Sequence, residues 1–204
     1  MNNEYVNSLR KNVKKAFKDD KSRYHHTIAV ANTAACLAFA HGADSEKAFI
    51  AGLLHDCAKC ISDEELIHIC TANNIPISEA EYASPYLLHA KVGAFYAQNK
   101  YMVEDEDILN AITYHTTGRP QMSLLEEIVF LADYIEPYRN KANNLNTVRS
   151  EAFKDIKEAI YIVTRDTLNY LKRTGKTIDS LTYDTYKFYE AETCDRDFLI
   201  ATDN

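Results

Sequence analysis

Residues 51–59, AGLLHDCAK, constrain the fold of this chain most strongly, because they set a polar pair inside an apolar run. His55 and Asp56 are adjacent in the middle of this run. A buried imidazole and a buried carboxylate are costly unless hydrogen bonds or a metal ion satisfy them. The fold must therefore bring further polar groups to this point from other parts of the sequence.

The composition favours long helices joined by short connections. The chain has 204 residues, of which 46% are hydrophobic, so one domain with a buried core is expected. Five glycines and four prolines are few, and both residues interrupt regular elements. The five cysteines are an odd number scattered along the chain, which argues against a disulfide framework.

Charge and hydropathy exclude two classes of partner. The formal net charge of −7 argues against a nucleic-acid polymer, because phosphate contacts need clustered lysine and arginine. The first residues, MNNE, are polar and begin no signal peptide, and no apolar run is long enough to span a membrane. We therefore expect a cytoplasmic protein without a membrane partner.

Apolar residues recur at helical spacing along most of the chain. The predicted helices cover residues 1–18, 21–41, 45–59, a short stretch after Ser62, 85–97, 104–115, 123–136, 148–173 and 180–191. Ser45 is the predicted N-cap of the third helix, Gly42 the stop of the second, and Ser62, Ser78 and Ser123 begin predicted capping boxes. Residues 116–122 form a predicted loop and 138–146 a surface connection. No strand alternation or repeat is present, so the predicted fold class is all-α.

Six polar residues share one setting, since each lies on or at the end of a predicted helix among apolar neighbours. They are His26, His55, Asp56, His89, His115 and Asp133. Facing helices of a bundle can bring such side chains together. Four imidazoles and two carboxylates form a nitrogen and oxygen donor set that suits iron, manganese or zinc.

The number of these residues indicates two metal ions. One catalytic ion must keep a coordination position open, so six side chains are too many for it. They suit two ions that share a bridging carboxylate, for which Asp56 is the candidate, and such a pair can stabilise the attacking and leaving oxygens at phosphorus. A single histidine on an apolar helix face is more often a hydrogen-bonded core residue. The prediction therefore depends on the whole set.

The order of His26, His55-Asp56 and Asp133 resembles the H…HD…D signature of the HD-domain phosphohydrolases. The closer resemblance is to the YqeK-type family of symmetrical dinucleoside tetraphosphatases. The segments that carry the resemblance are residues 23–30, 51–59, 87–89, 114–120 and 131–137. The pair HD alone is weak evidence, whereas YHTTGRP followed by LADYIEP is far more specific. Gln121 stands where many members of that family have glycine.

The resemblance implies a fold, a metal centre and an activity. The fold would be a single HD-type helical bundle over residues 1–204, with a core at about 20–137 and additional C-terminal helices at about 148–192 packed on it. The six residues would hold two divalent ions, iron in the first place, with manganese or zinc as alternatives. Diadenosine tetraphosphate would be cut in the middle to give two ADP. His26 is preferred to His25 as a ligand because it aligns with the motif.

Phosphate chemistry suggests which further residues support this reaction. Lys59 lies four residues after His55 and so on a similar face of the predicted helix. Arg119, in the loop after His115, can clamp a phosphate through two N–H groups. With Asp56, these two are the candidate catalytic residues. The substrate-binding candidates are Arg23, Lys59, Thr117, Gly118 and Arg119. For each, a solvated charge or a loop-forming role is an equal alternative.

Other motifs are discounted. Cys57 and Cys60 form a Cys-x-x-Cys pattern, but a zinc ribbon needs a second pair and a thioredoxin-like site needs a βαβ unit. His41 is interpreted as a helix C-terminal residue and His68 as structural. The fourteen tyrosines are interpreted mainly as packing residues, of which one or two could sandwich an adenine.

Two alternatives to the leading function stay open. One is an HD phosphohydrolase with another substrate, such as a deoxynucleoside 5′-phosphate or guanosine tetraphosphate. The other is a regulator that binds a nucleotide or a metal without catalysis. The expected partner is a small-molecule nucleotide, and a homodimer is an open alternative to a monomer.

Overall fold

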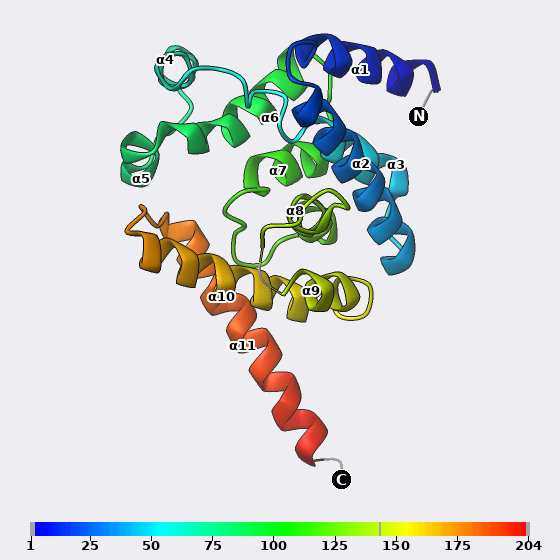
Figure 1. Ribbon diagram of the computed structural model, residues 1–204, viewed down its shortest axis with the longest axis vertical. Helices are drawn as coiled ribbons and strands as arrows, with labels where there is room; N and C mark the ends of the chain where they lie inside the picture. Colours follow the sequence, from blue (N-terminus) through cyan, green and yellow to red (C-terminus); the bar gives the residue numbers. More distant parts are fainter. Residues whose placement is uncertain (1–2, 143, 203–204) are drawn as a thin grey trace.

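The computed structural model describes residues 3–142 and 144–202, and side chains within 4–142 and 144–194. In this part of the chain it has eleven α-helices, one short 3-10 helix and no strand (Figure 1), which confirms the all-α prediction. The helices are α1 Asn3–Ala16, α2 Lys21–His41, α3 Ser45–Leu54, α4 Asp63–Ala72, α5 Glu79–Ala83, η1 Pro85–Leu88, α6 His89–Asn99, α7 Glu106–Tyr114, α8 Leu124–Ile135, α9 Leu145–Ala152, α10 Ile156–Thr174 and α11 Ser180–Thr202. Residues 1, 2 and 143, which belong to a predicted helix and a predicted connection, lie outside the described residues.

The helix-end signals are mostly found where the sequence places them. Ser78 and Ser123 begin reciprocal capping boxes with the glutamates three residues later. Gly42 ends α2 in the left-handed conformation, with φ +73°. Ser62 accepts a hydrogen bond from the backbone N–H of Glu65, which is one half of a capping box. The prediction for α3 was wrong by one residue, since Asp44 and not Ser45 caps it by accepting bonds from two backbone N–H groups.

Two predicted helices have different bounds. The predicted helix 45–59 is wrong at its end, because α3 stops at Leu54 and residues 55–60 form turns. Nδ1 of His55 lies 2.7 Å from the carbonyl oxygen of Gly52 and donates a hydrogen bond to it. In a continuing helix, this carbonyl would accept a hydrogen bond from a backbone N–H. The predicted helix 148–173 is divided into α9 and α10, because the Asp155 side chain caps a new helix.

The core surrounds α8, nine of whose twelve residues are buried. Helices α2 and α3 pack closely beside it through small residues such as Ala31, Ala34 and Ala51, which have no exposed surface. A Cβ atom on Gly52 would lie 2.9 Å from the Cα of Ala31, so this glycine permits the close approach. Close packing at this point sets the position of the residues that follow α3.

The C-terminal helices α9, α10 and α11 pack on one side of this core, one after another along the chain. Both α9 and α10 contact α8, and α11 contacts α10 before it extends away from the body in Figure 1. The fully buried Tyr189 of α11 donates a hydrogen bond of 2.7 Å to Glu127 of α8. This packing supports the predicted division into a core with added helices, although the domain boundaries stay a prediction.

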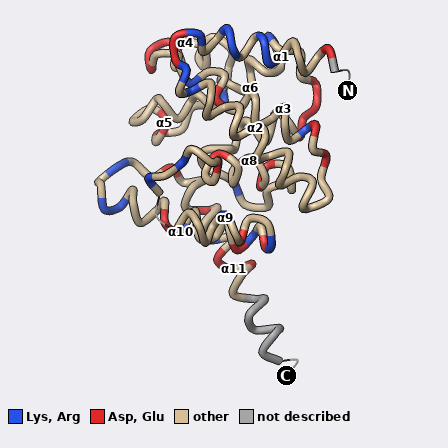
Figure 2. The backbone as a smooth tube through the Cα atoms, turned by 45° about the vertical axis from the view of Figure 1, so that its right-hand side comes forward, with Lys and Arg blue, Asp and Glu red and all other residues tan. Residues whose placement is uncertain are grey.

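Charges of both signs are distributed over the surface (Figure 2). Lysines lie along α1, and acidic residues fill the first turn of α4. None of the described helices is both long and apolar enough to cross a membrane. The cytoplasmic location stays a prediction.

Candidate metal centre

The six predicted polar residues come together from five helices. His26 lies in α2, His55 and Asp56 follow the end of α3, His89 is the first residue of α6, His115 follows α7, and Asp133 lies in α8. Three overlapping groups of three have ligand atoms within 4.8 Å of one another: His26, His55 and Asp56; His55, His115 and Asp133; and Asp56, His89 and His115. Helix ends place three of the imidazoles, those of His55, His89 and His115, at one point in the bundle interior, where they meet His26 of α2.

Three of the imidazoles are oriented by the same local hydrogen bond. The Nδ1 atoms of His55, His89 and His115 lie 2.7, 2.6 and 2.7 Å from the carbonyl oxygens of the residues three positions earlier, Gly52, Tyr86 and Ile112. A carbonyl only accepts, so Nδ1 donates, and this assigns the tautomer. The Nε2 atom of each ring is then directed to the shared centre, as in histidines that bind metals.

His26 is oriented by a carboxylate. Its Nδ1 lies 3.2 Å from Oε1 of Glu136, which is buried, and its Nε2 lies 3.1 Å from Oδ1 of Asp133. The other carboxylate oxygen of Glu136 accepts the backbone N–H of Tyr138. Sequence reasoning missed Glu136, although its place in the LADYIEP segment, three residues after Asp133, was a signal that could have found it.

The carboxylate of Asp56 has one oxygen on each side of the centre. Its Oδ2 lies 3.8 and 3.4 Å from Nε2 of His26 and His55, whereas Oδ1 lies 3.3 and 3.8 Å from Nε2 of His89 and His115. Asp133 adds a second carboxylate to the His26 and His55 side. One carboxylate between two pairs of imidazoles is the arrangement that a bridge between two ions requires.

The inward-facing imidazole nitrogen atoms have the chemistry of ligands for divalent cations. The Nε2 atom of His55 is buried and has no hydrogen-bond partner. The Nε2 atoms of His89 and His115 are 3.2 Å apart, and because both rings donate from Nδ1, neutral rings present two acceptors to each other. An unsatisfied buried polar atom costs about 1–3 kcal/mol. A divalent ion would satisfy Nε2 of His55 and would relieve the contact between the two acceptors.

The protein environment keeps two of the donors, His115 and Asp133, in the protonation states that metals need. Burial, together with the nearby His55 and His89, lowers the pKa of His115 to about 3, so this ring is neutral. Burial alone would raise the pKa of Asp133, but the hydrogen bond from His26 and the nearby His55 and Arg139 hold it well below its usual range. A neutral imidazole and an ionised carboxylate are the forms that coordinate a cation.

Residues 23–138 match the HD domain family. The symmetrical bis(5′-nucleosyl)-tetraphosphatase of Bacillus subtilis is 42% identical over 166 residues, which cover 81% of this chain and 88% of that protein. This chain belongs to the HD domain family. The family resemblance seen in the sequence is thereby confirmed.

Further relatives of this HD domain protein also match most of the chain. The symmetrical bis(5′-nucleosyl)-tetraphosphatase of Staphylococcus aureus is 33% identical, over 83% of this chain and 87% of that protein. A crystal structure of a predicted HD superfamily hydrolase involved in NAD metabolism from Clostridium acetobutylicum is 35% identical. It superposes with a TM-score of 0.85, over 89% of this chain and 97% of that chain.

Three cations contact the ligand set of this HD domain. Arg23 Nη1 lies 2.6 Å from Oδ2 of Asp56, and Arg139 Nη2 lies 2.9 Å from Oδ1 of Asp133. Lys59 Nζ lies 3.0 Å from Nε2 of His89. Lys59 was predicted to lie near the phosphate because it would share a helix face with His55. That reason was wrong, because α3 ends at Leu54 and no helix continues to Lys59. Arg139, just outside the matched residues, was missed because no motif in the sequence marked it.

The loop after α7 uses its predicted residues differently. Arg119 donates to Glu126 from both Nε and Nη2 and lies over the ring of Tyr114. The guanidinium of Arg119 therefore already has a protein partner. Its predicted contact with phosphate stays a prediction, and the bonds to Glu126 do not favour it. Thr116, which was missed, has its hydroxyl 3.2 Å from Nε2 of His115. Gln121 has a positive φ of 55°, which agrees with the glycine expected there in relatives.

Thr117 and Gly118 attach the same loop to α11. The carbonyl of Thr117 accepts a hydrogen bond of 3.1 Å from the hydroxyl of Thr185. A Cβ atom on Gly118 would lie 2.7 Å from Cγ2 of Thr185. Their predicted role as substrate donors stays a prediction, and the contacts with Thr185 give both residues a packing role.

The discounted motifs have structural contacts. Burial raises the pKa of Cys57 to about 12, and its thiol donates to the carbonyl of Gly93. His41 ends α2, and its Nε2 lies 2.7 Å from the carbonyl of Ala152. His68 is exposed on α4. These contacts give no ligand role to any of the three residues.

We expect Glu136→Gln to weaken metal binding by about 10- to 100-fold, the usual effect of removing a partner that orients a ligand. The amide keeps the shape of the side chain but removes the charge that holds the Nδ1–H of His26. Competition with a chelator measures the affinity, and circular dichroism checks that the helices are retained. Glu64→Gln, on the exposed first turn of α4, is the matched control. Equal affinities in the two variants would contradict a role for Glu136.

Proposed function

We propose that this chain is a metal-dependent hydrolase that cuts diadenosine tetraphosphate between its two central phosphates and releases two ADP. The relatives that bear the name of this activity align over most of the chain. The observation that carries the proposal is the carboxylate of Asp56 between two pairs of imidazoles. Two bound divalent ions would supply Lewis-acid stabilisation of the oxygens exchanged at phosphorus.

The proposed ligands are the six clustered residues, and the proposed cofactors are two ions per chain. His26 and His55 lie near Oδ2 of Asp56 and near Asp133, whereas His89 and His115 lie near Oδ1 of Asp56. Nitrogen and oxygen donors without a thiolate suit iron, manganese and zinc alike. Iron is placed first because the family resemblance implies it. Elemental analysis of protein purified without oxygen measures both the identity and the number of the ions.

The cations around the ligands are the proposed phosphate-binding groups. Arg23, Arg139 and Lys59 now contact Asp56, Asp133 and His89. Divalent ions bound to the same ligands would neutralise the carboxylates, which frees the cations for phosphate oxygens. Their side chains are about one third exposed, and both arginines line a cavity of about 560 Å³ that His26 also lines. A charged guanidinium can hold a phosphate through two parallel N–H groups.

We expect the metal-loaded protein to convert diadenosine tetraphosphate into ADP alone. Separation of the products by ion-exchange chromatography decides the position of the cut, since AMP with ATP would contradict a central one. His68→Ala, exposed on α4, should retain the activity. Turnover only of a deoxynucleoside 5′-phosphate or guanosine tetraphosphate would favour the other HD hydrolases. Nucleotide binding without any turnover would favour a regulator.

The oligomeric state is a separate question. A homodimer stays a prediction, and light scattering during size-exclusion chromatography tests it.

A further inference from the structure

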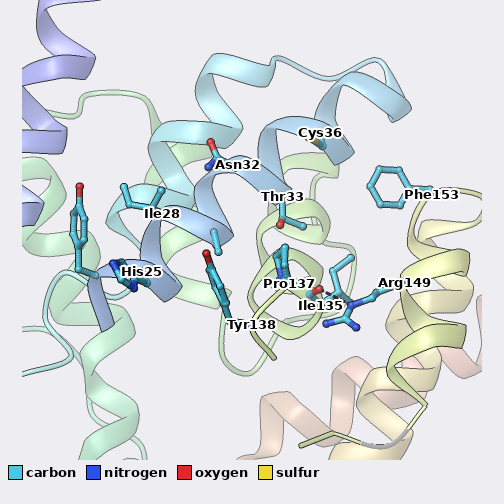
Figure 3. A pocket seen from close by; sticks show the side chains of 12 residues that line it. His25, Ile28, Asn32, Thr33, Cys36, Ile135, Pro137, Tyr138, Arg149 and Phe153 are labelled. Carbon is cyan, nitrogen blue, oxygen red and sulfur yellow. Dashed lines mark hydrogen bonds between the residues drawn. The ribbon is translucent and has the colours of Figure 1, made fainter. Parts of the chain in front are cut away.

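A second cavity adjoins the opening of the metal centre. It has a volume of about 730 Å³ and lies between α2 and the segment that links α8 to α9 (Figure 3). His25 and Tyr138 line both this cavity and the one of about 560 Å³ that Arg23, His26 and Arg139 line. The two cavities are therefore neighbours, and both have volumes typical of small-molecule sites.

The sequence neighbours of the centre form the boundary between the cavities. His25 precedes the proposed ligand His26, and successive residues of a helix point about 100° apart. His25 therefore faces the cavity boundary while His26 faces the metal centre. Tyr138 follows Glu136, which orients His26. A molecule between His25 and Tyr138 would therefore lie beside the cavity that Arg23, His26 and Arg139 line.

His25 and Tyr138 have the spacing of an aromatic slot. Their ring centroids are 6.5 Å apart and their planes are tilted by 30°. Stacked bases are about 3.4 Å apart, so the separation is near the two layers that one inserted base needs. Tyr138 is 69% exposed and His25 is exposed, so both rings can adjust. A base between them would cover aromatic surface that is now exposed to water.

The segment that carries Tyr138 is held by Arg149. The guanidinium of Arg149 donates to the carbonyls of Ile135, Glu136 and Arg139 at 3.0, 3.0 and 2.8 Å. These bonds fix the backbone of the turn, so only the two rings have to be ordered when a ligand binds, which lowers the entropic cost of binding.

The other walls suit a nucleoside. Ile28, Ala29 and Pro137 supply apolar surface, whereas Asn32 supplies an amide (Figure 3). An amide both donates and accepts, as the edge of adenine does. The cavity therefore combines stacking surface with a group that can read the base edge.

We propose that this cavity, with the slot between His25 and Tyr138, binds one nucleoside of the substrate. The base lies in the slot, and the phosphate chain extends to Arg23 and Arg139 at the metal centre. This inference rests on the proposed function and adds the nucleoside subsite to it. Stacking accepts any base, so the cavity favours nucleotides over bare polyphosphates.

A single tryptophan tests the slot without catalysis, because the chain contains no tryptophan. ADP and adenosine should quench the fluorescence of Tyr138→Trp in a saturable manner, with ADP binding more tightly. Tyr82→Trp, at a residue of α5 that is 58% exposed and does not line the cavity, is the matched control and should not respond. Equal responses of the two variants, or none in Tyr138→Trp, would overturn the subsite.

Kinetics separate this inference from the proposed function. His25→Ala and Tyr138→Ala should each raise KM for diadenosine tetraphosphate by about 5- to 100-fold, the effect of losing one stacking partner, with kcat within about twofold. The inhibition constant of inorganic tetraphosphate, which has no base, should stay unchanged. Unchanged KM values in both variants would overturn the subsite while the wild-type protein still releases ADP. A wild-type protein that does not cut diadenosine tetraphosphate would instead overturn the proposed function, and the fluorescence titration would still decide the slot.

Discussion

Asp56→Ala is expected to lower hydrolysis of diadenosine tetraphosphate by at least about 10³-fold and to remove at least one of the two proposed ions per chain. The carboxylate is the only group that faces all four imidazoles among the described residues, through Oδ2 on one side and Oδ1 on the other. Its removal takes away the one ligand that both proposed ions would share. Metal content by mass spectrometry and the rate of ADP release are measured on the same preparation.

Two controls make this result specific to the carboxylate. Asp56→Asn keeps the shape and removes the charge, so it should also lose metal. His68→Ala changes an exposed histidine on α4 and should retain both metal and activity. Circular dichroism should show unchanged helicity in all three variants, because Asp56 lies in the turns after α3. Full metal content and turnover in Asp56→Ala would contradict the bridging role.

The second large effect is expected from Gly52→Val, which should reduce the free energy of unfolding by about 3 kcal/mol. A Cβ atom at this position would lie 2.9 Å from Cα and 3.1 Å from N of Ala31, both backbone atoms that no rotamer change can move. The gain in helix propensity over glycine is below about 1 kcal/mol and does not offset this clash. At about 2–4 °C per kcal/mol, the melting temperature should fall by roughly 6–12 °C.

The same substitution should weaken metal binding, because His55 directly follows α3 and the Gly52 carbonyl accepts the Nδ1–H of that ring. Gly42→Ala is the control, since a Cβ atom there meets nothing within 4 Å and adds only the strain of its left-handed backbone. That strain costs about 1–2 kcal/mol. Metal affinity should not change in the control. A Gly52→Val protein as stable as the control would contradict the account of α2 and α3 packing.

The structure differs from the sequence-based predictions mainly where side chains compete with the backbone. The end of α3 was misplaced because the imidazole of His55 takes a carbonyl that the helix would need. The break between α9 and α10 was missed because Asp155, a residue that favours N-caps over helix interiors, was not recognised as the cap of a new helix. Both events depend on a single hydrogen-bonding choice, which hydrophobic periodicity does not register.

The sequence by itself determined that the chain is helical, because hydrophobic periodicity is a local property that each segment displays alone. It also supplied six polar residues whose order along the chain carries the family resemblance. Only the tertiary structure decided that Asp56 divides its two oxygens between two pairs of imidazoles and that Arg139, Glu136 and Thr116 contact this ligand set. It also decided that Arg119 pairs with Glu126. These contacts join residues from separate helices, and their distances follow from how the helices pack, which no single segment encodes.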